Sequence, residues 1–318
     1  MNNSNKKTKF VTSYYAFHFG PPFWCHQGRD GWYKYSLVTL CNMGHEIICY
    51  TDEGDKGYNQ LIQIKEKFKL ENLTLKIFKL EENPWQEQIY KIRIENPENY
   101  NNPNHHSYIR PTQVYWLKWF FMEKEIEPNI NLYWIDCGLA TGGLFPKSTS
   151  EWGDHPNWDK SFEGEVYRDV EYRHFSYTKA FNPEAVERIN NFHENKIIIM
   201  CSKQNFNDTS NFFEKTNIEP PLTRIGDYYL FPVAGFWGGD SNVILDYVKK
   251  FYDVAQKVLD CKNYLCTEQE IMYYLYHKET HLYKKWGFDT FYHEDWASKG
   301  AFSSNEISFS YFFRKELI

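Results

Sequence analysis

The stretch from Asn131 to Pro146 reads NLYWIDCGLATGGLFP: an apolar strand ends at one carboxylate, Asp136, and small residues follow. In an open α/β sheet, ligands bind beyond the carboxyl ends of the strands. Asp136 is therefore expected at the binding edge of such a sheet, where a carboxylate can hold a hard divalent cation. The alternative is that Asp136 simply caps a turn after a core strand.

The chain before this stretch alternates short β-type runs with helical patterns. This rhythm predicts an α/β fold with a Rossmann-like, mostly parallel central sheet flanked by helices. Strands are expected at 9–15, 46–51 and 73–78, and helices at 28–43, 58–68 and 112–124. After Pro146, strands are expected at 196–201, 227–233 and 288–293, and helices at 242–259 and 268–277.

The stretch between these two groups of elements has a different character. Residues 147–195 alternate aromatic and charged side chains and show no long apolar periodicity, which indicates an insertion of loops and short elements. We therefore expect a single domain over 1–318. It would consist of a nucleotide-binding half (1–146), the aromatic-rich insertion (147–195) and an acceptor and catalytic half (196–318).

Composition excludes several classes of protein. The 318 residues carry a formal net charge of −6, and the absence of a basic excess argues against a nucleic-acid partner. No stretch approaches the ~18 apolar residues of a membrane span, and no signal peptide is recognisable. The seven cysteines are scattered, without a CxxC pair. We expect a cytoplasmic protein without a transmembrane segment; peripheral association with the inner membrane face is compatible with this.

A second informative segment, Val233 to Asn242, reads VAGFWGGDSN. Its glycines predict a turn between a strand and a helix. Trp237 beside Gly238 and Gly239 could stack on a sugar while Asp240 accepts hydrogen bonds from sugar hydroxyls. The alternative is a tight structural turn with Trp237 in the core and Asp240 as helix N-cap.

Two segments near the C-terminus offer further candidates. In CTEQEIMYYL (266–275), Thr267 resembles an N-cap, and Glu268 or Gln269 could face the cleft and act on an acceptor hydroxyl. An ordinary acidic first helical turn explains the same pattern. In FDTFYHEDW (288–296), His293 follows a strand and could bind a metal or a phosphate, or lie on the surface without such a role.

Binding groups are also expected near the N-terminus. Thr12 and Tyr14 close the first strand and Asp52 closes the second, so parallel strands would bring them to one edge, where they suit a base and a ribose. Arg110 and Lys118 are eight residues apart and fall on one helix face, where they could offset the charge of a diphosphate. The alternative is that both are ordinary exposed basic residues without such a role.

In their order and spacing, these motifs resemble the WlaTC/HtrL/YibB family of bacterial glycosyltransferases. The likeness rests on FVTSYY, on YKYSLVTL leading to IICYTDE, on YWIDCGL with GLFP, on AGFWGGDSN and on TEQEIMYYL. It covers most of the chain but not the stretch from about 147 to 196. The resemblance implies a GT-A-like fold. It also implies transfer of a sugar from a nucleoside diphosphate-sugar, UDP-sugars being favoured, to a hydroxyl on a glycan or glycolipid.

The resemblance also suggests roles for single residues. In GT-A enzymes a DxD motif binds Mn²⁺ or Mg²⁺, and Asp136 matches one Asp, with His293 as a helper. The segment departs from the motif, because it reads IDCG and Gly138 holds the third place. The glycine-rich turn is also similar to that of blood-group-type retaining transferases, which makes Glu268 the candidate catalytic carboxylate and Asp240 a catalytic sugar ligand. Glu268 would be the base of an inverting reaction or would stabilise an oxocarbenium-like centre in a retaining one.

Two other functions remain open. A nucleotidyltransferase also combines a parallel sheet with carboxylate-held metal, but it needs a glycine-rich basic loop near the first strand, of which only 28–31 (GRDG) is an echo. A non-catalytic carbohydrate-binding protein would fit the incomplete DxD motif.

Overall fold

The computed structural model describes most of the chain. The described residues are 6–15, 37–38, 40–41, 43–54, 56–97, 109–137, 183–205, 210–220 and 228–287. The predicted strand at 288–293, His293, Gly138 and most of the 147–195 stretch lie outside them.

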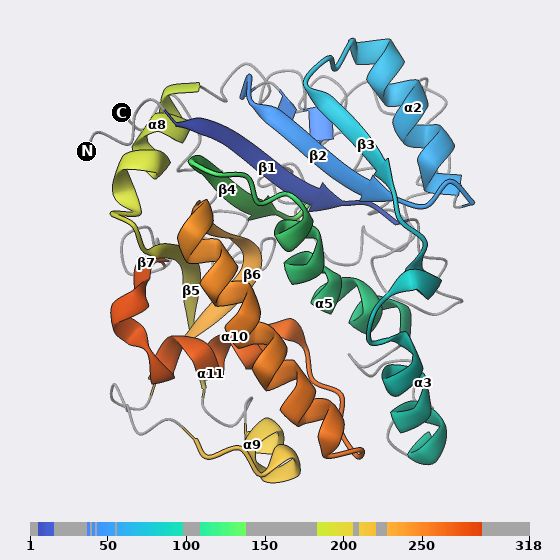
Figure 1. Cartoon of the computed structure of the whole chain (residues 1–318), viewed down its shortest axis with the longest axis vertical. Helices are drawn as coiled ribbons and strands as arrows, with labels where there is room; N and C mark the ends of the chain where they lie inside the picture. The colour runs from blue at the N-terminus through green and yellow to red at the C-terminus, as the bar shows by residue number, and fades with distance from the viewer. Residues whose placement is uncertain are drawn as a thin grey trace, which may run out of the picture. The chain divides into compact units, whose positions relative to one another are not determined.

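A seven-stranded sheet forms the centre of the fold, in the order β3-β2-β1-β4-β6-β5-β7 (Figure 1). The strands are β1 (Lys7–Ser13), β2 (Glu46–Thr51), β3 (Leu73–Ile77), β4 (Ile130–Ile135), β5 (Ile197–Asn205), β6 (Tyr228–Asp240) and β7 (Tyr283–Gly287). β1, β2 and β3 pair in parallel, and β5 pairs with β6 antiparallel. The prediction of an α/β fold with a mostly parallel central sheet flanked by helices is confirmed.

The helices contribute most of the remaining regular structure. They are α2 (Lys56–Phe68), α3 (Gln86–Glu95), α5 (Ile109–Lys124), α8 (Pro183–Phe192), α9 (Ser210–Thr216), α10 (Ser241–Asp260) and α11 (Glu268–Lys278), with short 3-10 turns η2 (Leu80–Glu82) and η6 (Thr280–Leu282). In the described residues, no helix has the length and apolar character needed to cross a bilayer.

The chain divides into two compact units that interleave along the sequence. Unit 1 is made of Met1–Ile77, Ile135–Phe192 and Gly287–Ile318, and unit 2 of Phe78–Trp134 and His193–Trp286. The chain passes from one unit to the other within β4 and again after α8. The expected division into a nucleotide-binding half, an insertion and a catalytic half stays a prediction.

Unit 1 is built on the three parallel strands, with α2 alongside β3 in Figure 1. All residues of β1 after Lys7, and all of β2 after Glu46, are buried, as expected for parallel strands covered on both faces. The register places Ser13 opposite Tyr50, so β1 and β2 end together at their carboxyl edge. In α8, the Asn190 side-chain amide donates a 2.8 Å hydrogen bond to Thr8 Oγ1.

His45 makes the stability of this unit depend on pH. Its ring packs edge-on to Phe10, and burial lowers its pKa from 6.5, although the charge of Glu187 partly opposes this. A lowered folded pKa favours the neutral ring in the folded state. The stabilisation is therefore present above the unfolded pKa of about 6.5 and is lost as the pH falls through the lower folded value.

We therefore expect the free energy of unfolding to be smaller at pH 5 than at pH 7, and His45→Gln to reduce that difference. Urea unfolding at the two pH values measures both. His281→Gln, at an exposed position, is the control and should leave the difference unchanged. An unaltered pH dependence in His45→Gln would remove His45 as its source.

Unit 2 has an aromatic core centred on α5. Four consecutive residues of this helix, 116–119, are buried. The Trp119 ring stacks on Phe251 of α10 at 3.8 Å between centroids and on Trp237 of β6 at 4.8 Å. Figure 1 shows α5 and α10 running side by side. The aromatic rings of α5, β6 and α10 named here therefore serve packing.

The end of β6 corrects one prediction. The glycine-rich segment 233–242 was expected to form a turn, but it continues as strand to Asp240, and α10 begins at Ser241. Opposite β5, the register jumps: Ile199 faces Trp237 while Met200 faces Val233, so the residues between them form a bulge. Glycine in a strand often marks a bulge or a close approach of two backbones, and β6 contains both.

Candidate functional site

A buried ion pair joins α5 to the start of α11. Lys118 Nζ lies 2.9 Å from Glu268 Oε1, and the two residues are 5% and 3% exposed. The same ammonium group donates a 3.3 Å hydrogen bond to the carbonyl oxygen of Ala234, in the bulge of β6. It also lies 5.6 Å from the ring centre of Trp134. Lys118 is thus held by a carboxylate, a carbonyl and an aromatic face within unit 2.

The sequence around Thr267 explains why α11 begins at Glu268. The Glu270 carboxylate accepts a 2.7 Å hydrogen bond from the backbone N–H of Thr267, as in a capping box. Trp116 of α5 donates from Nε1 to the carbonyl of Cys266 at 3.1 Å. Two side chains of α5, Trp116 and Lys118, therefore fix the first turn of α11.

The two acids of this turn differ in surroundings. Burial raises the pKa of Glu270, and its hydrogen bonds from Tyr264 and Thr267 partly oppose the rise. Glu270 is occupied by these bonds, whereas Glu268 faces the ammonium group of Lys118. The helix N-terminus and Lys118 both stabilise a negative charge on Glu268. The ion pair thus fixes the position of the Glu268 carboxylate.

Asp136 lies where the sequence predicted it, directly after β4, whose six residues are all buried. Asp136 itself is half-buried and belongs to unit 1. Its oxygens suit Mn²⁺ or Mg²⁺, but one carboxylate is not a complete ligand set. Within the described ranges, no group of three His, Cys, Asp or Glu side chains could hold a metal ion. The metal thus stays a prediction for Asp136 and His293.

The residues expected to hold a sugar have structural partners in unit 2. Trp237 has no exposed surface, and it packs between Trp119 and Tyr247. Asp240 is 5% exposed and caps α10 by accepting a 2.9 Å bond from the Asn242 N–H. Its charge also contributes, after burial, to the raised pKa of Tyr133. These contacts agree with the structural alternative for the segment, and the sugar-binding role of Asp240 stays a prediction.

Gly238 and Gly239 are needed for packing. A Cβ at Gly238 would lie 2.3 Å from the carbonyl oxygen of Leu132, and one at Gly239 would lie 2.6 Å from that of Lys196. Only glycine lets β6 pass this close to its neighbours, and this requirement explains both residues without a ligand.

The other predicted binding residues are placed as follows. Thr12 is fully buried, and its hydroxyl has no hydrogen-bond partner among the residues described. Tyr14 is buried with its hydroxyl 3.5 Å from Gln60 Oε1, and Asp52 accepts a 2.8 Å bond from the Gly54 N–H. These three residues lie at the common carboxyl edge of β1 and β2. Gln269 is half-exposed in the first turn of α11.

Arg110 lies in the first turn of α5, and its side chain is outside what the structure describes. The sequence analysis named both Lys118 and Glu268 but gave them separate tasks, a diphosphate contact and a catalytic carboxylate. The sequence contains an indication of this pairing, because Lys118 is the only charged residue in the apolar run WLKWFF. A single charge in such a run indicates a buried partner.

The sequence matches no protein-family model and no curated protein. Among solved structures, the chain is similar to mouse xyloside xylosyltransferase 1 in its apo form, with a TM-score of 0.41 and 7% sequence identity. The alignment covers 88% of this chain and 84% of the mouse chain. A likeness this weak is no evidence for a shared activity, and membership of the WlaTC/HtrL/YibB family stays a prediction.

Proposed function

We propose that the chain is a glycosyltransferase that moves a sugar from a nucleoside diphosphate-sugar to a hydroxyl on a glycan or glycolipid. UDP-sugars are the favoured donors. The observation that carries the proposal is the position of Asp136, a partly exposed carboxylate that directly follows a fully buried strand of an α/β sheet. Ligands of such sheets bind at strand ends of this kind.

In this proposal, Asp136 holds Mn²⁺ or Mg²⁺, and His293 is the second proposed ligand. When bound, the metal would offset the charge of the diphosphate and of the leaving group. Thr12, Tyr14 and Asp52, at the shared edge of β1 and β2, are the proposed contacts to the base and ribose.

Glu268 is the proposed catalytic carboxylate. Its ion pair with Lys118 holds the carboxylate in the first turn of α11. It would act as the base of an inverting reaction or would stabilise an oxocarbenium-like centre in a retaining one. Lys118 then acts as a positioning residue, since its ammonium group is committed to Glu268 and the Ala234 carbonyl.

Thermal unfolding with a panel of UDP-, GDP-, CMP- and TDP-sugars, in Mn²⁺ and in EDTA, tests the donor and the metal together. We expect one nucleotide-sugar to raise Tm by a few degrees in Mn²⁺, since a ligand at ~100 times its Kd adds about 2.7 kcal/mol. Asp136→Ala should lose the shift. Asp253→Ala, at an exposed position of α10, should keep it.

The other outcomes separate the parts of the proposal. A shift that persists in EDTA and in Asp136→Ala retains the nucleotide-sugar donor and removes Asp136 as metal ligand. No shift with any nucleotide would contradict the transferase and favour a carbohydrate-binding protein.

A further inference from the structure

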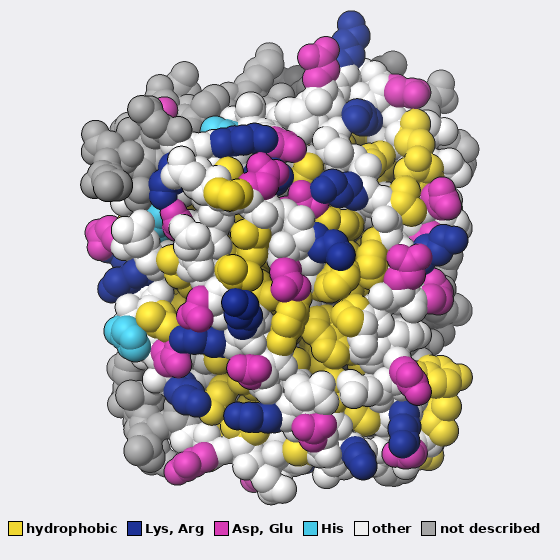
Figure 2. All heavy atoms as spheres, in the orientation of Figure 1, with side chains coloured by type: hydrophobic (Ala, Val, Ile, Leu, Met, Phe, Trp, Pro, Cys, Tyr) yellow, Lys and Arg dark blue, Asp and Glu magenta, His cyan; other side chains and the backbone are white. Residues whose placement is uncertain are grey.

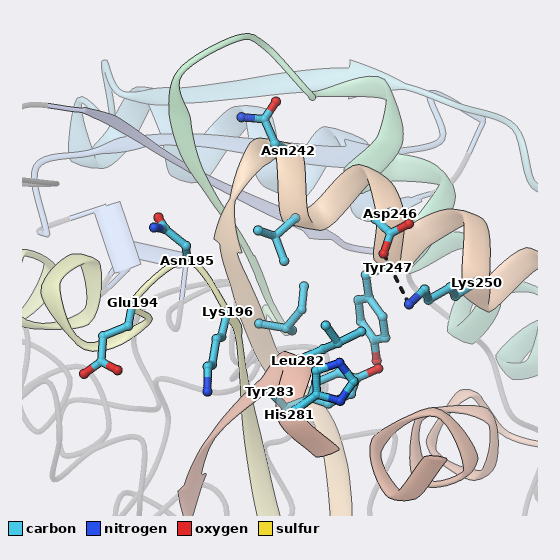
Figure 3. Close-up of a pocket in the computed structure, with 12 residues that line it drawn as sticks. Glu194, Asn195, Lys196, Asn242, Asp246, Tyr247, Lys250, His281, Leu282 and Tyr283 are labelled. Atoms are coloured by element: carbon cyan, nitrogen blue, oxygen red, sulfur yellow. Dashed lines mark ion pairs between the residues drawn. The ribbon is translucent and has the colours of Figure 1, made fainter. Parts of the chain in front are cut away.

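Unit 2 contains a pocket of about 490 Å³ at the amino end of β5. Figure 3 shows its walls: the turn before β5, the first turns of α10, and the segment after α11. Its lining residues are Glu194, Asn195, Lys196, Ile197, Asn242, Val243, Asp246, Tyr247, Lys250, His281, Leu282 and Tyr283. The volume lies within the range of small-molecule sites, about 300–1,000 Å³.

The lining combines apolar groups with a polar rim. Ile197, Val243 and Leu282 offer aliphatic surface, and the rings of Tyr247 and Tyr283 pack at 5.6 Å between centroids. The rim carries amides, carboxylates, ammonium groups and an imidazole. Sugars present the complementary surface, because their C–H faces are apolar and their edges carry hydroxyls that both donate and accept.

The charges around the pocket balance. Lys250 pairs with Asp246 at 3.3 Å and with Glu279, while Glu194 pairs with Lys284 at 2.7 Å. Among the lining residues themselves, the two ammonium groups of Lys196 and Lys250 balance the two carboxylates of Glu194 and Asp246. A site for phosphate or a nucleotide normally has a positive excess, so this balance favours a neutral polyhydroxyl ligand.

Two tyrosines of the pocket wall have unused hydrogen-bonding capacity. The hydroxyls of Tyr247 and Tyr283 are buried and have no partner within the described part of the chain. Burial raises the pKa of both, so both keep their protons. Both oxygens lie below the accessible surface, so a ligand in the pocket meets the tyrosine rings and not the hydroxyls.

The pocket is separate from the Lys118–Glu268 pair. Glu268 opens α11, whereas residues 281–283 follow its far end. The eleven residues of α11 span about 16 Å at 1.5 Å per residue.

We propose that this pocket binds a neutral mono- or disaccharide unit of a glycan, at a distance from the Lys118–Glu268 pair. One part of the inference rests on the proposed function: the sugar unit would belong to a remote part of the acceptor glycan of the transferase. The binding itself requires neither donor nor metal.

Saturation-transfer NMR with lactose, maltose and cellobiose, in EDTA and without nucleotide, tests the site. We expect transfer to at least one disaccharide. Asn242→Trp, which fills the pocket from an exposed position, should abolish it, while Asp253→Trp, further along α10, should retain it. Asn195 has a left-handed backbone (φ 60°), so Asn195→Gly removes the amide without strain and should weaken binding about fivefold, as for one lost hydrogen bond.

Three results would overturn the inference: no transfer to any disaccharide, unchanged transfer in Asn242→Trp with native circular dichroism, or displacement of the sugar by inorganic phosphate. Its failure is distinguishable from failure of the proposed function. Disaccharide binding without any nucleotide-dependent rise in Tm would support the pocket and contradict the transferase. A nucleotide-dependent rise in Tm without disaccharide binding would support the transferase and contradict the sugar-binding pocket.

Discussion

Lys118→Met is expected to lower the free energy of unfolding by about 3–5 kcal/mol, because it leaves the Glu268 carboxylate buried without a counter-charge. Glu268→Leu should cost a similar amount by stranding the ammonium group. The double variant Lys118→Met/Glu268→Leu should recover most of the loss, since apolar side chains of similar volume often replace a buried ion pair without penalty. Urea unfolding of the four proteins gives the coupling energy directly.

Lys250→Met is the matched control. Lys250 also forms ion pairs, with Asp246 and Glu279, but its side chain is 28% exposed. Its replacement should cost no more than about 1 kcal/mol, as for other solvated pairs. Equal costs for Lys118→Met and Lys250→Met would mean that burial does not set the strength of the Lys118–Glu268 pair.

The double variant also separates packing from chemistry. It keeps the fold but has no charge at position 268, so the proposed transferase activity should be lost while stability is retained. Turnover at the wild-type rate in this variant would leave Glu268 with a structural role only.

Gly238→Ala is expected to be as damaging, with a loss of about 4 kcal/mol or more. The new Cβ would lie 2.3 Å from the Leu132 carbonyl oxygen and 2.6 Å from the Tyr133 Cα. Both are backbone atoms of β4, so no side-chain rotation relieves the contact and one of the strands must shift. Thermal unfolding and the yield of folded protein measure the effect.

Gly54→Ala is the matched control, because it makes the same glycine-to-alanine change at another position. Its Cβ would meet only Asp52 Oδ1 at 3.3 Å among the described atoms, the end of a half-exposed side chain in a turn. We expect a change within about 0.5 kcal/mol. A Tm for Gly238→Ala equal to that of Gly54→Ala would show that β6 does not pass β4 as closely as described.

The sequence predicted those elements whose signals are local. β2 begins and ends as expected because an apolar run is bounded by Gly44 and by the turn after Thr51. α10 and α11 begin within one residue of prediction because Asp240 and Thr267 are recognisable caps. By contrast, α3 buries only Ile89 and Ile92, and β7 reads YKKWG; neither has a periodicity that sequence analysis detects.

The parts that the sequence could not predict depend on contacts between distant segments. A glycine in a β-type run can indicate either a turn or a strand that passes close to its neighbour. For Gly238 the second explanation holds, because the backbone of β4 leaves no room for a Cβ. The partner of Lys118 lies in another helix, so the apolar run around Lys118 can indicate that it is buried but not which residue it pairs with. For the same reason the pocket beside β5, assembled from three separate segments, left no motif.

The stack formed by Trp119, Phe251 and Trp237 also gives the protein an internal optical signal. Near-ultraviolet circular dichroism arises from aromatic rings held in fixed, asymmetric packing, and it disappears when packing loosens even if the helices persist. Two indoles held 4.8 Å apart at an interplanar angle of 20° report on the hydrophobic centre of unit 2 without any added label. Each variant described above can thus be inspected for a loosened interior before its binding or turnover is interpreted.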